Sequence, residues 1–75
     1  TMIDNIMNIY KDLKRKGDFT KDAAEEFGIK PSTMKIHWLH EKGIPENVLE
    51  SFHTFIVNWA KQEIERMKYN LSQNS

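Results

Sequence analysis

The sequence predicts an all-α fold, a small four-helix helix-turn-helix domain with a long C-terminal helix. Two observations predict it. Apolar residues recur at intervals of three and four along most of the chain, which is the period of a helix with one buried face. Gly28 and Pro31 follow each other closely, and a glycine that ends one helix shortly before a proline that opens the next is typical of a helix boundary. No segment needs the two-residue period of a strand to explain it.

The chain of 75 residues is expected to form one domain, residues 1–75. A domain of this size buries only about 60% of the surface of its unfolded chain, so we expect a partner to support it. The absence of cysteine excludes a disulfide framework and a thiolate metal site, and we expect neither a metal ion nor a cofactor. No apolar run approaches a membrane span, and no charged-then-apolar leader opens the chain. We therefore expect a cytoplasmic protein with no membrane partner.

The first two helices are expected near residues 3–16 and 20–27. The apolar residues at helical spacing in the first are Ile3, Ile6, Met7, Tyr10 and Leu13. Gly17 is expected to end that helix, and Thr20 to cap the next one, with Phe19 packing back onto its first turn. Ala24 is expected where the helix over 20–27 crosses its successor, because only a small side chain fits there.

The third helix is expected near residues 31–42, with Met34 and Trp38 facing inward because they lie four residues apart. Two interpretations of Ile36 remain, a core side chain beside Leu39 or a surface side chain that contacts thymine methyl groups, and the core position is slightly favoured.

A twenty-residue segment, residues 20–39, resembles the DNA-binding domains of phage-repressor-type (Xre and Cro-like) regulators. The residues that carry the resemblance are Ala24, Gly28, Ile29, Pro31, Ser32, Thr33 and Met34. Lys30 departs from the usual pattern, which often has a capping serine there. The resemblance implies a sequence-specific, repressor-like transcriptional regulator of a phage, plasmid or other bacterial mobile element, which binds double-stranded DNA at an inverted repeat as a homodimer.

On this hypothesis Ser32, Thr33 and Lys35 meet base edges or nearby phosphates, because they lie at the exposed start of the third helix. The expected DNA-binding residues are Lys14, Arg15, Lys16, Lys21, Lys30, Ser32, Thr33, Lys35, Ile36, His37 and His40. The basic run 14–16 has a second interpretation, in which it only compensates the dipole at the end of the first helix. His37 and His40 are three residues apart, but without a third ligand nearby we interpret them as surface histidines.

Net charge is the main argument against a nucleic-acid binder, because 11 basic and 11 acidic residues sum to zero. The charges are nevertheless segregated along the sequence. Lysines and arginine crowd residues 11–16 and surround the third helix, whereas carboxylates gather on the second and last helices. A basic face and an acidic face can therefore coexist on a neutral molecule.

The last helix is expected to run from about residue 45 to residue 71, a length of roughly 40 Å at 1.5 Å per residue. A compact domain of this size is only about 30 Å across, so part of the helix should lack an intramolecular partner. The expected dimer-interface residues are Trp59, Ile64, Met67 and Leu71. The other interpretation is that the helix frays near Glu63 and the polar tail is disordered.

A second hypothesis of a different class is a helical protein-interaction module. It would bind a partner protein through the aromatic face of the last helix, formed by Phe52, Phe55 and Trp59. An enzyme is not expected, because the sequence has no cysteine nucleophile, no interpretable Ser-His-acid set and no phosphate-binding glycine loop.

Overall fold

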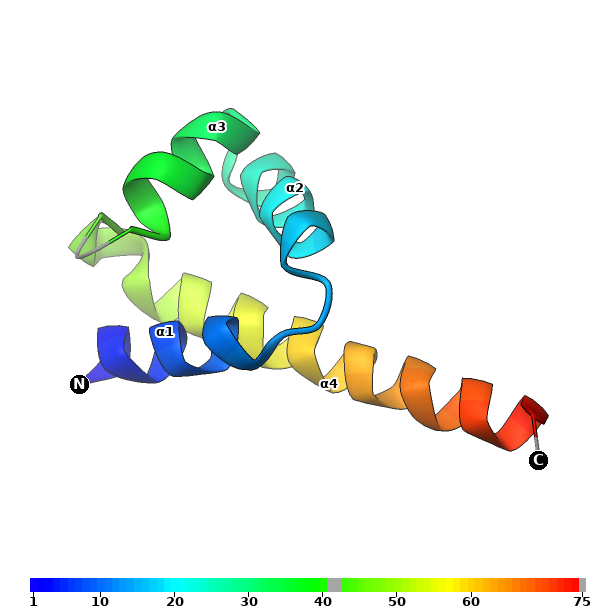
Figure 1. The fold of residues 1–75 in the computed structure, drawn as a ribbon. Helices are drawn as coiled ribbons and strands as arrows, with labels where there is room; N and C mark the ends of the chain where they lie inside the picture. Colours follow the sequence, from blue (N-terminus) through cyan, green and yellow to red (C-terminus); the bar gives the residue numbers. More distant parts are fainter. Residues whose placement is uncertain (41–42, 75) are drawn as a thin grey trace.

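The computed structural model describes residues 1–40 and 43–74, and in these residues the fold is all-α with no strand. Its elements are α1 (Met2–Asp12), α2 (Lys16–Phe27), α3 (Pro31–Thr33), the π-helical turn η1 (Met34–Trp38), the 3-10 turn η2 (Glu46–Val48) and α4 (Leu49–Asn74). Figure 1 shows α1 along the first half of α4, with α2 and α3 on the other side of the body. The all-α fold with a long last helix is as the sequence predicts.

The aromatic core is centred on Phe19 in α2, which is fully buried. Its ring centroid lies 6.0 Å from that of Phe52 and 5.4 Å from that of Trp59, both edge-on and both on α4. Tyr10 of α1 approaches the same ring at 5.9 Å. Such tilted and edge-on pairs add to the burial of each ring. Phe19 therefore joins three helices, rather than stapling only the first turn of α2 as the sequence suggested.

The boundary between α1 and α2 differs from the prediction. α1 ends at Asp12, because Leu13 is extended and buried, and its N–H donates to the Tyr10 carbonyl at 3.1 Å. α2 begins at Lys16, so Gly17 lies inside α2 and does not stop α1. The expected end of the first helix at residue 16 is therefore wrong. The cause is tertiary, since the backbone amides of the connecting residues are bound by a carboxylate of α4.

Thr20 is not the N-cap of α2, as the sequence predicted, but an internal residue one turn further on. It is 8% exposed, and its hydroxyl donates to the carbonyl of Lys16 at 2.8 Å. This local bond satisfies the hydroxyl within the helix. The residue at the N-cap is Arg15, whose side chain makes no capping hydrogen bond.

The turn of the predicted helix-turn-helix is confirmed. Gly28 has φ 70° and ψ 31°, a left-handed conformation that favours glycine. The N–H of Ile29 donates to the Ala24 carbonyl at 2.9 Å, and that of Gly28 to Glu25 at 3.3 Å, which is the Schellman ending of a helix. Ala24 is 1% exposed and α2 packs on α3, in agreement with its expected place at the crossing.

The third helix widens into a π turn after Thr33. The N–H of Leu39 donates to the Met34 carbonyl, five residues back, at 2.8 Å. This wider turn buries Met34 and Leu39 together and leaves Ile36 61% exposed. The core interpretation of Ile36 is therefore wrong. Regular helix ends at Trp38, and the last two residues of the expected helix, 41 and 42, lie outside the described residues.

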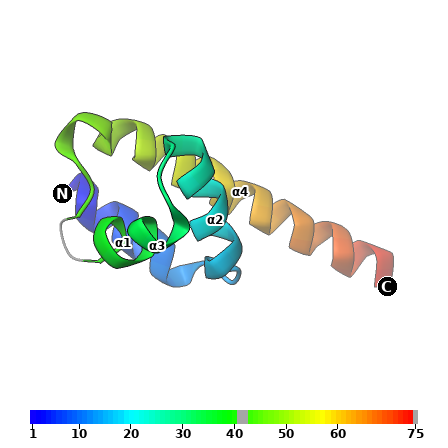
Figure 2. The same ribbon diagram turned by 90° about the horizontal axis from the view of Figure 1, so that it is seen from above.

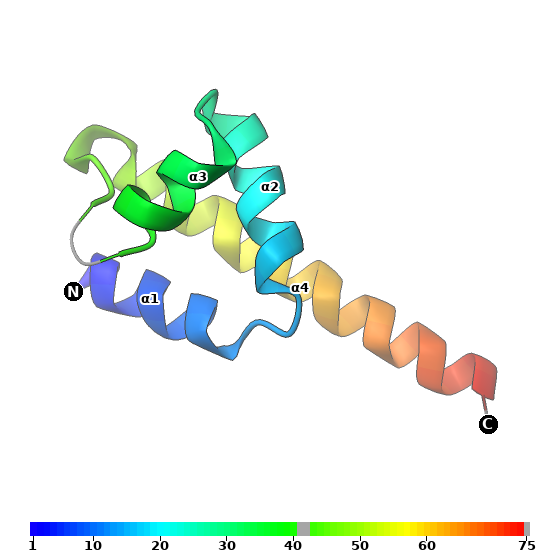
Figure 3. The same ribbon diagram turned by 45° about the horizontal axis from the view of Figure 1, so that its top comes forward.

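The last helix α4 has 26 residues and begins at Leu49, after the η2 turn that Pro45 caps. Its C-terminal third projects past the other helices in all three ribbon views (Figure 1, Figure 2 and Figure 3). The long axis of the molecule is 43 Å, against 25 and 17 Å for the other two. Helical backbone continues through Glu63, so the interpretation that the helix frays there is wrong. We call Ile64, Met67 and Leu71, which are 45–69% exposed, the distal stripe.

Candidate nucleic-acid interface

A basic cleft of about 470 Å³ lies between the start of α2 and the start of α3. We call it the lysine cleft. Its lining residues are Tyr10, Lys16, Gly17, Thr20, Lys21, Pro31, Ser32 and Lys35. Three of them are lysines and none is acidic. The cleft therefore unites four of the predicted DNA-binding residues, which come from two separate segments of the chain.

The backbone of α2 and α3 positions these side chains. Lys16 opens α2, and its ammonium donates to the Leu13 carbonyl at 2.8 Å, which fixes it beside the cleft. Lys21 lies further along α2, and Lys35 is the second residue of η1. Within residues 1–40 and 43–74, no carboxylate lies within 4.0 Å of the ammonium of Lys21 or Lys35. These two cations are exposed and available to an external anion.

The outer surface of α3 and η1 continues the cleft. Ser32, Lys35, Ile36 and His37 are exposed, and Thr33 is half-buried. Met34 is fully buried and attaches this segment to the body. The exposed side chains at its start offer hydroxyl, ammonium and aliphatic groups, which are the chemical types that read the edges of base pairs in the major groove.

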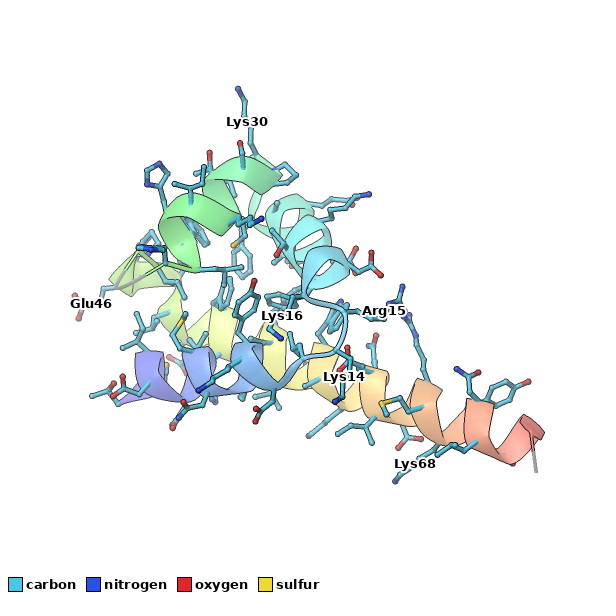
Figure 4. The ribbon with its side chains drawn as sticks, viewed as in Figure 1. Lys14, Arg15, Lys16, Lys30, Glu46 and Lys68 are labelled. Carbon is cyan, nitrogen blue, oxygen red and sulfur yellow. The ribbon has the colours of Figure 1, made fainter. Side chains whose placement is uncertain are left out.

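Not all of the predicted basic residues lie together. Figure 4 shows Lys30 at the turn between α2 and α3, and Lys14, Arg15 and Lys16 at the opposite end of α2. The guanidinium of Arg15 binds the Asp18 carboxylate, with an Nε–Oδ2 distance of 2.7 Å. Arg15 is therefore already paired, whereas Lys14 and Lys30 are exposed at two separate ends of this surface.

Neither of the two predicted histidines lines the lysine cleft. His37 and His40 are both exposed. No group of three or more histidine, aspartate or glutamate side chains in the described part of the chain could hold a metal ion.

Three of the four carboxylates of α2 line a different groove, of about 550 Å³, between α2 and α4. We call it the acidic groove. Its lining residues are Asp22, Glu25, Glu26, Phe55, Asn58, Trp59, Gln62 and Arg66. The two clefts share no lining residue. The charge segregation that the sequence indicated is only partial in space, because a smaller hollow is lined by Lys21 together with Asp18 and Asp22.

The four residues predicted for a dimer interface do not share one face. Trp59 packs against Phe19, and its indole N–H donates to the Asp22 carboxylate at 2.9 Å. At 100° per residue it lies about 80° to 140° around α4 from the distal stripe. Trp59 therefore belongs to the joint between α4 and α2, whereas Ile64, Met67 and Leu71 remain uncovered in this chain.

One structurally important residue was missed by the sequence reasoning. Glu63 is 9% exposed, and its two carboxylate oxygens accept the backbone N–H groups of Lys14 and Arg15, each at 3.0 Å. The available signal was its spacing, because Glu63 continues the inward positions Phe52, Ile56 and Trp59 at intervals of four, three and four. A carboxylate in such a position needs a buried partner.

Comparison with protein-family models, with curated proteins and with solved structures finds no match to this chain. The resemblance of residues 20–39 to phage-repressor-type regulators thus stays a prediction. None of the helices in the described residues combines the length and apolar character that a membrane span requires.

Proposed function

We propose that this protein is a sequence-specific DNA-binding regulator, repressor-like in its design, that binds an inverted repeat as a homodimer. The observation that carries the proposal is the lysine cleft beside the exposed start of α3. Lys21 and Lys35 supply positive charge from two helices, and no acidic side chain lines the space between them. This arrangement fits a phosphate backbone passing along α2 while α3 enters the adjacent major groove.

The exposed residues of α3 and η1 would supply specificity. Ser32 and Thr33 carry hydroxyl groups that donate and accept hydrogen bonds, and Ile36 presents an aliphatic side chain that is 61% exposed. Contact between such a side chain and thymine methyl groups is a known mode of base reading. The buried Met34 holds the segment in place, so its outward residues are free to meet DNA.

The zero net charge is compatible with this function because the acidic groove opens between α2 and α4, without sharing residues with the lysine cleft. The carboxylates that line the acidic groove would then repel DNA from that groove and not from the lysine cleft. Few phosphate contacts per protomer imply weak non-specific binding. Two copies acting together would compensate, because the second half-site is bound at a high effective concentration.

The homodimer is proposed from the distal stripe. Its three exposed apolar residues follow each other at intervals of three and four. They lie on a helix that extends beyond the other helices of the domain. A second copy of the chain offers the same stripe, and pairing of identical surfaces is the commonest oligomeric arrangement.

The proposal is tested by selecting binding sites from a random library of DNA duplexes with the purified protein. We expect enrichment of an inverted repeat, whose binding weakens when Lys35 or Thr33 is replaced by alanine. Enrichment of no common sequence would contradict the proposal.

The acidic groove favours a second candidate function, a protein-interaction module. Phe52 is fully buried, so only part of the predicted aromatic face of α4 can contact a partner. Phe55 and Trp59 line the acidic groove beside Glu25 and Glu26. These groups suit a cationic partner segment. Retention on heparin at low salt separates the two candidates, since only the DNA-binding protein should be retained.

A further inference from the structure

Glu63 contacts the basic run 14–16 although the two are far apart in the sequence. It lies in α4, and its carboxylate accepts the N–H groups of Lys14 and Arg15, 49 and 48 residues earlier in the sequence. At 9% exposed, it is the one charged side chain of the described residues that is buried. A buried carboxylate that accepts two amide N–H groups is well satisfied, whereas one without them would be costly.

The two amides that Glu63 binds lie immediately before α2. The first N–H groups of a helix have no partner within it, and a side chain at the N-cap usually accepts from one of them. Arg15 occupies the N-cap here and makes no such bond. Glu63 does not supply the missing N-cap bond. It binds the turn before α2, and it does so from another helix, α4. It also places a negative charge near the positive end of the α2 dipole.

We propose that Glu63 is a positioning residue for DNA binding. By holding Lys14 and Arg15 through their backbones, it sets where α2 begins and therefore where Lys16 and Lys21 enter the lysine cleft. This inference rests on the proposed DNA-binding function. Without the bond, the basic segment would have to be ordered when DNA binds, and affinity would fall by the cost of that ordering.

The proposal and simple electrostatics predict opposite changes in DNA affinity when the Glu63 carboxylate is removed. Removing a carboxylate that binds the backbone of Lys14 and Arg15 should strengthen the binding of a polyanion, if charge alone matters. If position matters, the same change should weaken it. Glu65 provides the matched control, because it lies two residues further along α4, is 75% exposed, and approaches Lys68 only at 4.0 Å.

The experiment measures the binding of a labelled random-sequence DNA duplex at low ionic strength to the full chain and its variants. We expect Glu63→Gln to weaken binding roughly three- to tenfold, the effect of ordering a flexible segment on binding. Glu65→Gln removes the same charge and should bind as tightly as the wild type or more tightly. A Glu63→Gln variant that is folded and binds as tightly as the wild type overturns the proposal.

Amide hydrogen exchange provides a readout that does not depend on DNA. The Lys14 and Arg15 amides should be protected in the wild type and exchange faster in Glu63→Asp, which keeps the charge but is one methylene shorter. Unchanged protection in that variant overturns the proposal. If both amides lose protection but the wild-type chain does not bind the duplex, the DNA-binding function fails and Glu63 has only a structural role, which also overturns it.

Discussion

The indole N–H of Trp59 donates to the carboxylate of Asp22 at 2.9 Å, and this bond joins α4 to α2 beside the aromatic core. The bond holds the middle of α2, while the Glu63 carboxylate holds the segment before this helix. Both contacts come from the same long helix. α4 therefore holds α2 and the segment before it in position.

Replacing Trp59 by Phe should lower the free energy of unfolding by about 1 kcal/mol, because the ring contact with Phe19 is largely kept while the hydrogen bond is lost. Denaturant unfolding measures this change. Asp22→Asn is the matched control, since its amide oxygen can still accept from the indole, and we expect it to stay within about 0.5 kcal/mol of the wild type. An equal loss in Asp22→Asn would show that a neutral amide oxygen cannot replace the carboxylate as the acceptor of this bond.

Gly17 and Gly28 form a matched pair that separates backbone conformation from packing. A Cβ atom at either position would meet no other atom within 4 Å, but only Gly28 has a positive φ, of 70°. Gly17→Ala should stabilise the protein by about 0.5–1 kcal/mol, because alanine loses less conformational freedom in a helix. Gly28→Ala should destabilise it by about 1–2 kcal/mol through left-handed strain.

Thermal melting of these two variants gives the measurement. A destabilised Gly17→Ala would mean that Gly17 is not inside a helix, and would restore the boundary that the sequence suggested.

The π turn predicts a contrast between Met34 and Ile36. Met34→Ala should lower the free energy of unfolding by about 2–5 kcal/mol, the usual cost of a cavity at a fully buried site. Ile36→Ala should change it by no more than about 0.5 kcal/mol, because this side chain is 61% exposed. Denaturant unfolding of both variants tests the contrast. Similar losses would place Ile36 in the core and contradict the wide turn.

Lys35 should contact DNA directly. Lys35→Ala should weaken binding to the selected duplex, and if the contact is to a phosphate, the slope of log K against log salt should fall in magnitude by about 1. Lys68, which is 71% exposed on the distal part of α4, is the control, because it has the same charge and lies away from the lysine cleft. Equal effects of Lys35→Ala and Lys68→Ala would indicate a general charge effect and remove the segment formed by α3 and η1 as the reading element.

The turn between α2 and α3 is predictable from sequence because its determinants are local. Gly28 supplies the left-handed residue, and Pro31 keeps Lys30 extended with φ −73° and ψ 145°. The start of α2 is not predictable in this way, because the carboxylate of Glu63 that binds Arg15 comes from 48 residues away. A sequence pattern carries no signal of that pairing.

The same distinction applies to the candidate site. Lys21, Ser32 and Lys35, three of the residues predicted to bind DNA, line one cleft because a short turn joins the segments that carry them. The exposure of Ile36 is not predictable, since a helix of 3.6 residues per turn places it differently from a π turn closed by the bond from Leu39 to Met34. Lys14 and Lys30 separate because α2 begins at Lys16 and lies between them.

The distal stripe should be the surface through which two copies associate. Met67→Glu places a charge in the middle of the stripe, at a position that is 45% exposed in the single chain, so the fold itself should not suffer. The control is Tyr69→Glu, which makes the same charge change at a large side chain, 64% exposed and about 140–160° around α4 from the stripe. Sedimentation should show a dimer for the wild type and Tyr69→Glu, and a monomer for Met67→Glu. Binding of Met67→Glu to an inverted repeat should then fall about 100-fold or more, because the effective concentration supplied by the second protomer is lost. A wild-type chain that sediments as a monomer at high micromolar concentration would remove the distal stripe as a dimer interface.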